Sequence, residues 1–189
     1  MPKQDLLEAV VDHLQEHGLG DQSLRAIAEA VGSSHRMLVY HFGSRAGLLA
    51  AVVEEVERRE RAATEKAVAG VEPTEAARRI WAAVSEPSRA PEECLFFELV
   101  GQAIQGVPGT EALRDNLVGP WLDLGAALAE ELGADPAEAR VVTRLDVAIV
   151  RGLLLDLLAT GDRRGVQAAH DRYLAWRATA TATAPATAD

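Results

Sequence analysis

The chain has 189 residues, of which 48% are hydrophobic and 25% charged, and its formal net charge at pH 7 is −10. This length allows the core of one or two small domains, and the single cysteine, Cys94, excludes an internal disulfide and fits a reducing compartment. There is no basic and apolar leader and no run of about 18 apolar residues, so we expect no signal peptide, no membrane span and a cytoplasmic location.

Apolar spacing and glycine punctuation predict three helices near the N-terminus. The first covers residues 5–17, and Gly18 ends it. The second covers 24–31 between Ser23, a possible cap, and Gly32, while the third covers 35–41 between Ser34 and Gly43. Two short helices joined by a glycine-containing turn are typical of a helix-turn-helix, which places side chains in a DNA major groove.

A long helix is predicted over residues 44–69, with Ser44 as its cap and a densely charged second half. It runs without a linker from the N-terminal unit into the rest of the chain, so a tilt of this helix would move both parts together. Further helices are predicted over 74–85, 91–105, 110–132, 136–160 and 162–179, and no segment alternates as a strand does. The predicted fold is all-α, with about nine helices.

Three regions follow from this pattern. Residues 1–49 form the predicted helix-turn-helix DNA-binding domain, and residues 50–178 form a helical ligand-binding and dimerisation domain. Residues 179–189 have low complexity and no apolar anchor, so we expect a disordered tail.

The charge pattern around the helix-turn-helix supports contact with a polyanion. Although the whole chain is acidic, no Asp or Glu occurs between Glu29 and Glu54. Phosphate contacts supply most of the affinity of DNA-binding proteins, so an acidic chain that binds DNA needs such a window. The alternative is that any small helical domain can contain two helices joined by a turn.

Over about the first 55 residues, the sequence resembles the DNA-binding domain of TetR-family transcriptional regulators. The family pattern runs Thr/Ser-x-Arg-x-Ile-Ala, Gly-Val-Ser, Leu-Tyr-x-His-Phe and Ser-Lys-x-x-Leu-Leu. The matching residues are Ser23, Arg25, Ile27, Ala28, Gly32, Ser34, Leu38, His41, Phe42, Ser44, Leu48 and Leu49. Ser33, Val39 and Arg45 depart from the pattern, although Arg45 keeps the positive charge of the usual lysine and Tyr40 lies beside Val39.

Candidate DNA contacts fall into two groups. We predict that His35, Arg36 and Met37 face base edges, where an arginine can pair with guanine through two hydrogen bonds. The predicted phosphate contacts are Ser23, Tyr40, His41 and Arg45, and the motif residues Arg25 and Ser34 complete the DNA-binding set.

A dimer interface is predicted on the helix at 136–160, which is apolar on most sides apart from a stripe of Arg140, Arg144 and Arg151. With the helix at 162–178 it would form a four-helix interface between two subunits, which is also where the TetR family dimerises. A symmetric reader of two half-sites needs such an interface. The alternative is that the helix is buried within its own subunit.

A ligand site is predicted among the few aromatic residues of the bundle. Such a pocket is mostly apolar with a few polar groups. The candidate residues are Trp81, Phe96, Phe97, Glu98, Gln102, Trp121 and Asp156. Two alternatives stay open, namely that the aromatics are core residues and that Asp146 and Asp156 pair with arginines of a neighbouring helix or subunit.

The sequence predicts neither catalysis nor a cofactor. Cys94 is interpreted as a core residue, and His13 and His17 lack a third ligand at a recognisable metal-binding spacing. The resemblance implies a homodimeric repressor that binds double-stranded DNA at a near-palindromic operator and is released by a small, largely apolar effector of unknown identity. The alternatives are a DNA-binding factor without a ligand, and an all-α sensor or enzyme that has lost DNA binding.

Overall fold

The computed structural model describes residues 1–20, 22–68, 70–108, 110–131 and 133–183, and over these residues the chain is helical and contains no strand. The all-α prediction is confirmed. The helices are α1 (Lys3–His17), α2 (Leu24–Ala30), α3 (His35–Phe42), α4 (Arg45–Val68), α5 (Pro73–Val84), the 3₁₀ helix η1 (Pro87–Arg89), α6 (Ala90–Ile104), α7 (Glu111–Asn116), α8 (Gly119–Glu131), α9 (Pro136–Thr160) and α10 (Arg163–Thr183).

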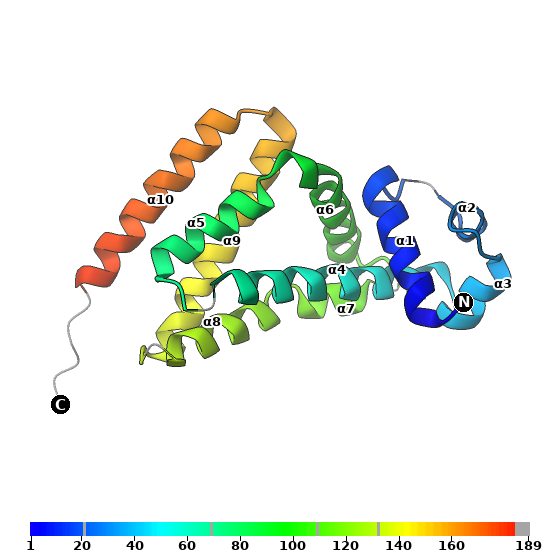
Figure 1. The fold of residues 1–189 in the computed structure, drawn as a ribbon, viewed down its shortest axis with the longest axis horizontal. Coiled ribbons are helices and arrows are strands. Elements are labelled where there is room, and N and C mark those ends of the chain that lie inside the picture. The colour runs from blue at the N-terminus through cyan, green and yellow to red at the C-terminus, as the bar shows by residue number, and fades with distance from the viewer. Residues whose placement is uncertain (21, 69, 109, 132, 184–189) are drawn as a thin grey trace.

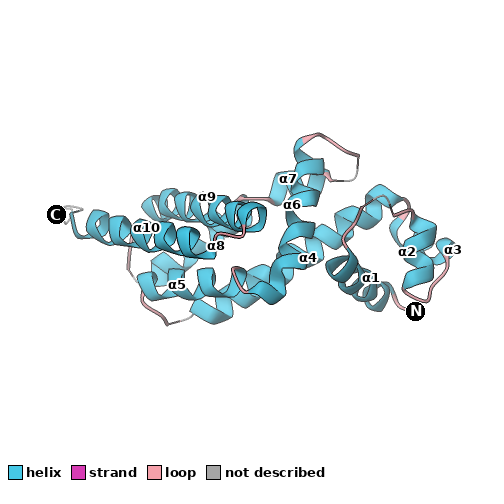
Figure 2. Ribbon diagram, turned by 90° about the horizontal axis from the view of Figure 1, so that it is seen from above, coloured by secondary structure: helices cyan, strands magenta, loops and turns pink. Residues whose placement is uncertain are grey.

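The molecule is elongated, and α4 links its two ends. Helices α1, α2 and α3 surround the start of α4 at one end, whereas α5, α8, α9 and α10 lie at the other (Figures 1 and 2). Helices α6 and α7 stand between the two groups in both views. The predicted continuity between the N-terminal unit and the bundle is therefore provided by α4, a helix of 24 residues.

Among the described residues, the larger of two apolar cores crosses the domain boundary predicted after residue 49. Its buried side chains come from α1 to α4 and also from α6 and α7, which contribute Leu95, Leu99, Ala103 and Leu113. Each fully buried Leu contributes about 1.5–3 kcal/mol relative to exposure, so the three leucines hold α6 and α7 firmly against the N-terminal unit. A second core joins α5, α9 and α10 through Trp81, Leu154, Leu157 and Val166.

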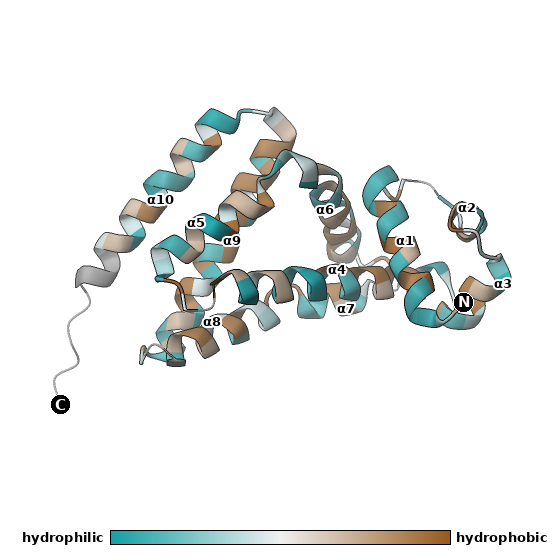
Figure 3. Cartoon of the chain, viewed as in Figure 1, coloured by the Kyte–Doolittle hydropathy of each residue, from teal (hydrophilic) through white to brown (hydrophobic). Residues whose placement is uncertain are grey.

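The helix segments that contribute to these cores are apolar, and the segments outside them are more polar. The first half of α4 buries Leu48, Leu49 and Val52, whereas its second half is mostly teal, that is hydrophilic, in Figure 3. Helix α9 is browner along its length than α10 in the same figure. Within the described residues, no helix has both the length and the apolar character needed to cross a membrane.

The helix predicted over 110–132 is two helices, α7 and α8. Proline has no N–H to donate, and its ring clashes with the carbonyl four residues earlier. Pro120 therefore interrupts the helix after Asn116, and α8 starts again at Gly119.

The other differences concern the C-terminus and the cysteine. Helix α10 continues to Thr183, so residues 179–183 are helical and not part of a disordered tail. Alanine favours helix, and extending a formed helix costs little. The rest of the predicted tail, 184–189, lies outside the described residues.

Cys94 is exposed rather than in the core, because its neighbours Glu93 and Leu95 take the buried side of α6.

Candidate nucleic-acid interface

Serine side chains begin three consecutive helices of the N-terminal unit. The Oγ of Ser23 accepts a hydrogen bond from the Ala26 N–H at 3.2 Å, and the Oγ of Ser34 accepts one from the Met37 N–H at 3.2 Å. Ser44 accepts from the Gly47 N–H at 3.0 Å. Each bond pairs an N–H that has no partner within its helix, so the sequence predicted these three helix starts correctly.

Helix α3 separates a buried face from an exposed face. Leu38 and Phe42 enter the larger core, and Met37 packs against it. On the other side, His35 and Arg36 are exposed, and Tyr40 exposes 78% of its surface. Since these side chains lie on one short helix, α3 offers a polar surface held rigidly by its own core contacts.

The turn from α3 to α4 requires two glycines for different reasons. Gly43 has a φ of +76°, which side-chain-bearing residues rarely adopt. Gly47 adopts helical geometry, but a Cβ on it would lie 2.0 Å from the carbonyl oxygen of Phe42. This close approach fixes the angle at which α3 leaves α4.

A groove on the surface brings several of the predicted DNA contacts together. Its lining includes Arg25 on α2 and the residues from Ser33 to Arg36 at the start of α3. Glu29 lines the same groove and is the acidic residue that borders the acid-free window. Arg25, Ser34, His35 and Arg36 therefore line one surface groove.

The predicted phosphate contacts differ in how they are presented. Ser23 and Tyr40 are exposed, whereas Arg45 is half-buried and donates from Nε to the Gln22 carbonyl at 3.2 Å. The Nε2 of His41 is buried among the described atoms without a hydrogen-bond partner. His41 thus turns this nitrogen away from solvent, and its ring lies edge-on to those of Tyr40 and Phe42.

Lys3 was missed by the sequence reasoning. Its Nζ lies 5.6 Å from the centre of the Phe42 ring, so it adds a cation beside the C-terminal end of α3. Lys3 is far from the helix-turn-helix in sequence, and no local motif signals this proximity.

The histidines of α1 stabilise the loop before α2. His13 Nε2 lies 3.0 Å from Oε1 of Gln22, and Gln22 donates to the Gly18 carbonyl at 2.8 Å. His17 stacks on His13 with 4.6 Å between the ring centres. No group of three or more His, Cys, Asp or Glu side chains in the described ranges is arranged to hold a metal ion.

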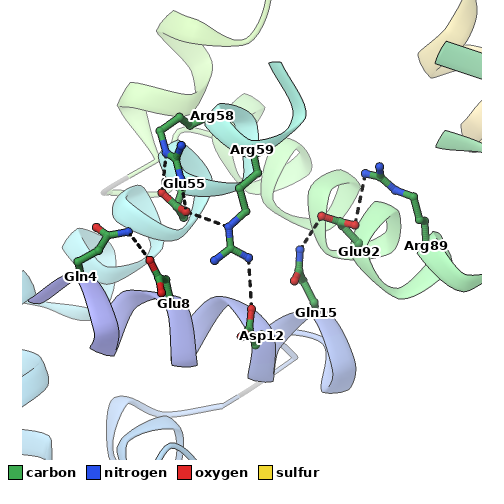
Figure 4. Close-up of polar contacts among 9 residues, drawn as sticks. All are labelled: Gln4, Glu8, Asp12, Gln15, Glu55, Arg58, Arg59, Arg89 and Glu92. Carbon is green, nitrogen blue, oxygen red and sulfur yellow. Dashed lines mark hydrogen bonds and ion pairs between the residues drawn. The ribbon is translucent and has the colours of Figure 1, made fainter. Parts of the chain in front are cut away.

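A polar network joins α1 to α4 and α6 (Figure 4). Arg59 donates to Glu55 at 2.8 Å and to Asp12 at 3.2 Å, while Gln15 donates to Glu92 at 2.6 Å. The hydrogen bond from Arg58, opposed by burial and reinforced by Arg59, lowers the pKa of Glu55 to about 2. These contacts tie the N-terminal unit to the bundle at a place where the sequence signalled only charge.

The residues predicted to line a ligand pocket are dispersed. Trp81 stacks on His170, with ring centres 4.8 Å apart, and its Nε1 donates to Gln167 at 2.8 Å. Phe97 packs against the second core. For Trp81 and Phe97, the core interpretation that stayed open from the sequence describes their position.

Phe96 and Trp121 have polar partners. Phe96 lies 5.0 Å from the guanidinium carbon of Arg151, and Trp121 donates from Nε1 to Glu57 at 3.0 Å. Their rings thus cover a buried ion pair.

The polar candidates of the pocket are not gathered either. Glu98 and Gln102 are half-buried on α6, whereas Asp156 is exposed on α9, so it does not face a cavity in this chain. Asp156 lies away from Leu154 and Leu157, which take the buried side of α9. The interpretation as an ion pair is confirmed for Asp146, which contacts Arg177 of α10 at 3.2 Å and accepts a bond from Tyr173.

A cavity of about 240 Å³ lies elsewhere, between the end of α5, η1, α6, α9 and the start of α10. Leu154, Leu157 and Leu158 give it an apolar wall, and Glu93 and Arg163 give it charged groups. None of the predicted ligand residues lines it. This site could not be predicted from local sequence, because its lining comes from segments about 70 residues apart.

The N-terminal unit is similar in sequence to known bacterial regulatory proteins. Residues 3–52 match the family model described as "Bacterial regulatory proteins, tetR family". The HTH-type transcriptional regulatory protein RaaS of Mycobacterium tuberculosis is 39% identical over 67 residues, which are 35% of this chain. The matched stretch spans only 31% of RaaS.

The whole fold also has counterparts among solved structures. A transcriptional regulator from Rhodococcus sp. Rha1 has a TM-score of 0.76 at 20% identity, covering 93% of this chain and 95% of its own. A TetR-like transcriptional regulator from Rhodococcus sp. RHA1 has a TM-score of 0.59 at 26% identity, covering 95% and 98%. The N-terminal unit, residues 3–52, is thus similar to the TetR family of bacterial regulatory proteins, and the whole chain shares its fold with solved transcriptional regulators.

Proposed function

We propose that the protein is a homodimeric transcriptional repressor that reads a near-palindromic operator by placing one α3 helix per subunit in successive major grooves. The observation that carries this proposal is the exposed face of α3, where His35, Arg36 and Tyr40 project from a helix fixed by its buried side. A short helix held in this way is the reading element of helix-turn-helix proteins.

The contacts of α3 suggest a role for each side chain. Arg36 lies at the N-terminal end of α3 and is the candidate for guanine recognition, with His35 beside it. Met37 packs partly against the core, so its share in base reading is smaller. Tyr40, Ser23, Arg25 and Lys3 are the candidates for phosphate contact, while Arg45 supports the loop before α2 and adds positive charge.

Two arginine variants test this proposal. DNA is first selected from a random pool with the wild-type protein, and the affinity for the selected sequence is measured at several salt concentrations. Arg36→Ala should lose about 1–3 kcal/mol of discrimination at one base position, because guanine pairing is removed. Arg45→Ala should weaken binding to all sequences and lower the salt slope by about one unit, because one cation near the phosphates is lost.

Arg79→Ala is the matched control, since it removes the same charge from an exposed position on α5, outside the proposed DNA-binding and dimer surfaces. It should leave both sequence preference and salt slope unchanged. The DNA-reading proposal fails when the wild type selects no sequence, or when Arg36→Ala and Arg45→Ala both bind as the wild type does. That outcome would favour an all-α sensor or enzyme that has lost DNA binding.

Exposed apolar side chains on α9 and α10 support the proposed homodimer. Val141, Leu145 and Leu155 on α9 and Trp176 on α10 each expose more than half of their surface. Large apolar side chains that gather on neighbouring helices are typical of a protein interface. We infer that a second copy covers them, which makes a four-helix interface from α9 and α10 of both subunits.

We also propose a small, largely apolar effector that releases the protein from DNA. The cavity beside Leu154 and Leu157 supports this better than the residues chosen from the sequence, since it combines an apolar wall with the buried carboxyl of Glu93. Release from nearly full to nearly empty operator occupancy needs roughly 5 kcal/mol of differential affinity. A DNA-binding factor without a ligand is the alternative.

A further inference from the structure

Arg151 on α9 contacts three other parts of the chain from a largely buried position. Its side chain is 21% exposed, although the sequence placed it in a polar stripe with Arg140 and Arg144. The three arginines of that stripe have different surroundings in the structure. Arg140 pairs with Asp123, and Arg144 is exposed, whereas Arg151 points into the molecule.

The first contact of Arg151 depends on the break between α7 and α8. Because Pro120 ends α7 early, the Trp121 N–H donates to the Val118 carbonyl. The Leu117 carbonyl is bonded instead by Nη1 of Arg151 at 2.9 Å. The break between α7 and α8 thus leaves a carbonyl group for which Arg151 provides the hydrogen-bond donor.

The other contacts reach α4 and α6. Nη2 of Arg151 lies 3.4 Å from Oε1 of Glu57, whose side chain is 6% exposed. The other oxygen of Glu57 accepts from Trp121 at 3.0 Å and from Arg61 at 3.3 Å. The Arg151 guanidinium also lies over the Phe96 ring at 5.0 Å.

These contacts add a polar connection between the two apolar cores, which also meet where Phe97 of α6 packs against the second core. Leu95, Leu99 and Leu113 place α6 and α7 in the core of the DNA-binding unit, while α9 belongs to the second core. Arg151 is the side chain of α9 that reaches α4, α6 and the end of α7 together. Burial lowers the pKa of Arg151 and raises that of Glu57, and each group's charge opposes the shift of the other.

We propose that Arg151 is the positioning residue that fixes the orientation of the DNA-binding unit relative to α9, and thereby the distance between the two α3 helices of a dimer. The proposal rests on the proposed function, in which α9 belongs to the dimer interface. A residue at this point sets which spacing of half-sites the dimer accepts, without touching DNA itself.

The test measures preference for half-site spacing. The DNA sequence selected by the wild type is altered by inserting or deleting one base pair at its centre, which rotates one half-site relative to the other. The wild type should bind both respaced sequences about tenfold more weakly than the original. A tenfold change in affinity lies within the usual range of energetic coupling between two binding sites. Arg151→Met keeps the apolar stem but removes the charge and the donors, so it should bind all three spacings within about twofold.

Two further variants separate positioning from simple stability. Arg79→Met changes an exposed arginine on α5, outside the proposed interface of α9 and α10, and should keep the wild-type preference. Arg151→Lys keeps the charge, but one ammonium group cannot bond both Glu57 and the Leu117 carbonyl as the forked guanidinium does, so its preference should lie between those of wild type and Arg151→Met. If Arg151→Met does not fold, the spacing preference of Arg151→Lys still tests the proposal. The proposal is overturned if the Arg151 variants discriminate among spacings as strongly as the wild type.

A second measurement does not depend on DNA. Spin labels are placed at Ala30→Cys on α2 and Ala175→Cys on α10, both exposed positions, in a Cys94→Ser background. The labelled full-length protein is mixed with excess unlabelled protein, so that distances within one subunit are recorded. The distance distribution should widen in Arg151→Met and stay unchanged in Arg79→Met. An unchanged width in Arg151→Met refutes the positioning role, whereas a wild type that selects no DNA refutes the proposed function.

Discussion

Glu93 lies on α6 with 7% of its surface exposed, and burial raises the pKa of its carboxyl to about 7. The neighbouring charge of Glu60 raises it further, whereas Arg89 opposes the rise from 3.3 Å away. The folded protein therefore retains a proton on Glu93 at pH values where the unfolded chain has released it. A carboxyl in this state destabilises the fold increasingly as pH rises from about 4.5 to about 7.

Glu93→Gln should remove that pH-dependent penalty. Below about pH 4.5 both forms carry a neutral side chain, so their free energies of unfolding should differ least there. Between about pH 4.5 and 7 the variant should become progressively more stable than the wild type, and above pH 7 the difference should level off at about 1–3 kcal/mol. Urea unfolding at a series of pH values measures this.

Glu86→Gln serves as the comparison, because Glu86 lines the same cavity but is exposed. Its unfolding free energy should stay parallel to that of the wild type at every pH. A Glu93→Gln curve that also stays parallel would show that Glu93 does not take up a proton on folding.

At the scale of single elements, local sequence determines where the N-terminal helices begin and end. Ser23, Ser34 and Ser44 carry their own capping interactions, and Gly43 allows the positive φ between α3 and α4. These features depend on residues at most four apart, so they can be predicted from the chain alone. The exposed face of α3 follows in the same way, because the spacing of Leu38 and Phe42 assigns the buried side.

Contacts between distant elements could not be predicted in this way. Arg151 looked like a solvated residue by helical periodicity, but its partner Glu57 is 94 residues away. Asp156 looked buried by the same periodicity and is exposed. Periodicity gives the face of a helix but not the helix that packs against it. Where several helices surround an apolar one, the sequence cannot place its charged residues.

The cavity between α6, α9 and α10 connects elements of both cores, and a ligand bound there should stabilise the fold. A screen of small apolar amines and neutral compounds by thermal unfolding tests this. A compound at 100 times its Kd adds about 2.7 kcal/mol, or roughly 5–10 °C in Tm for a chain of this size.

Ala90→Leu places extra volume in this cavity and should abolish the rise in Tm, whereas Ala82→Leu on the exposed side of α5 should not. If no compound raises the Tm of the wild type, or if Ala90→Leu responds as the wild type does, the effector proposal loses its site. The first of these results favours a DNA-binding factor without a ligand.

For the molecule as a whole, the proposed dimer depends on the apolar surface of α9 and α10. Leu145 is 57% exposed, and a glutamate at this position would bring two carboxylates into a proposed two-fold interface. The wild type should therefore have twice the chain mass of 20.2 kDa in sedimentation equilibrium, and Leu145→Glu should have the chain mass itself.

Ile104→Glu is the control for this substitution, because Ile104 is also exposed but lies at the end of α6. It should leave the mass of the dimer unchanged. A monomeric wild type, or a Leu145→Glu variant that still dimerises, would argue against an interface on α9.

The extension of the larger core into α6 and α7 has a consequence for synthesis of the chain. Leu95, Leu99, Ala103 and Leu113 complete the apolar packing around α1 to α4, yet the ribosome adds them long after the helix-turn-helix itself. Until Leu113 has emerged, the nascent N-terminal segment keeps an uncovered apolar side. The part of the protein that is proposed to read DNA is thus made first and finished late, after more than half of the chain has been translated.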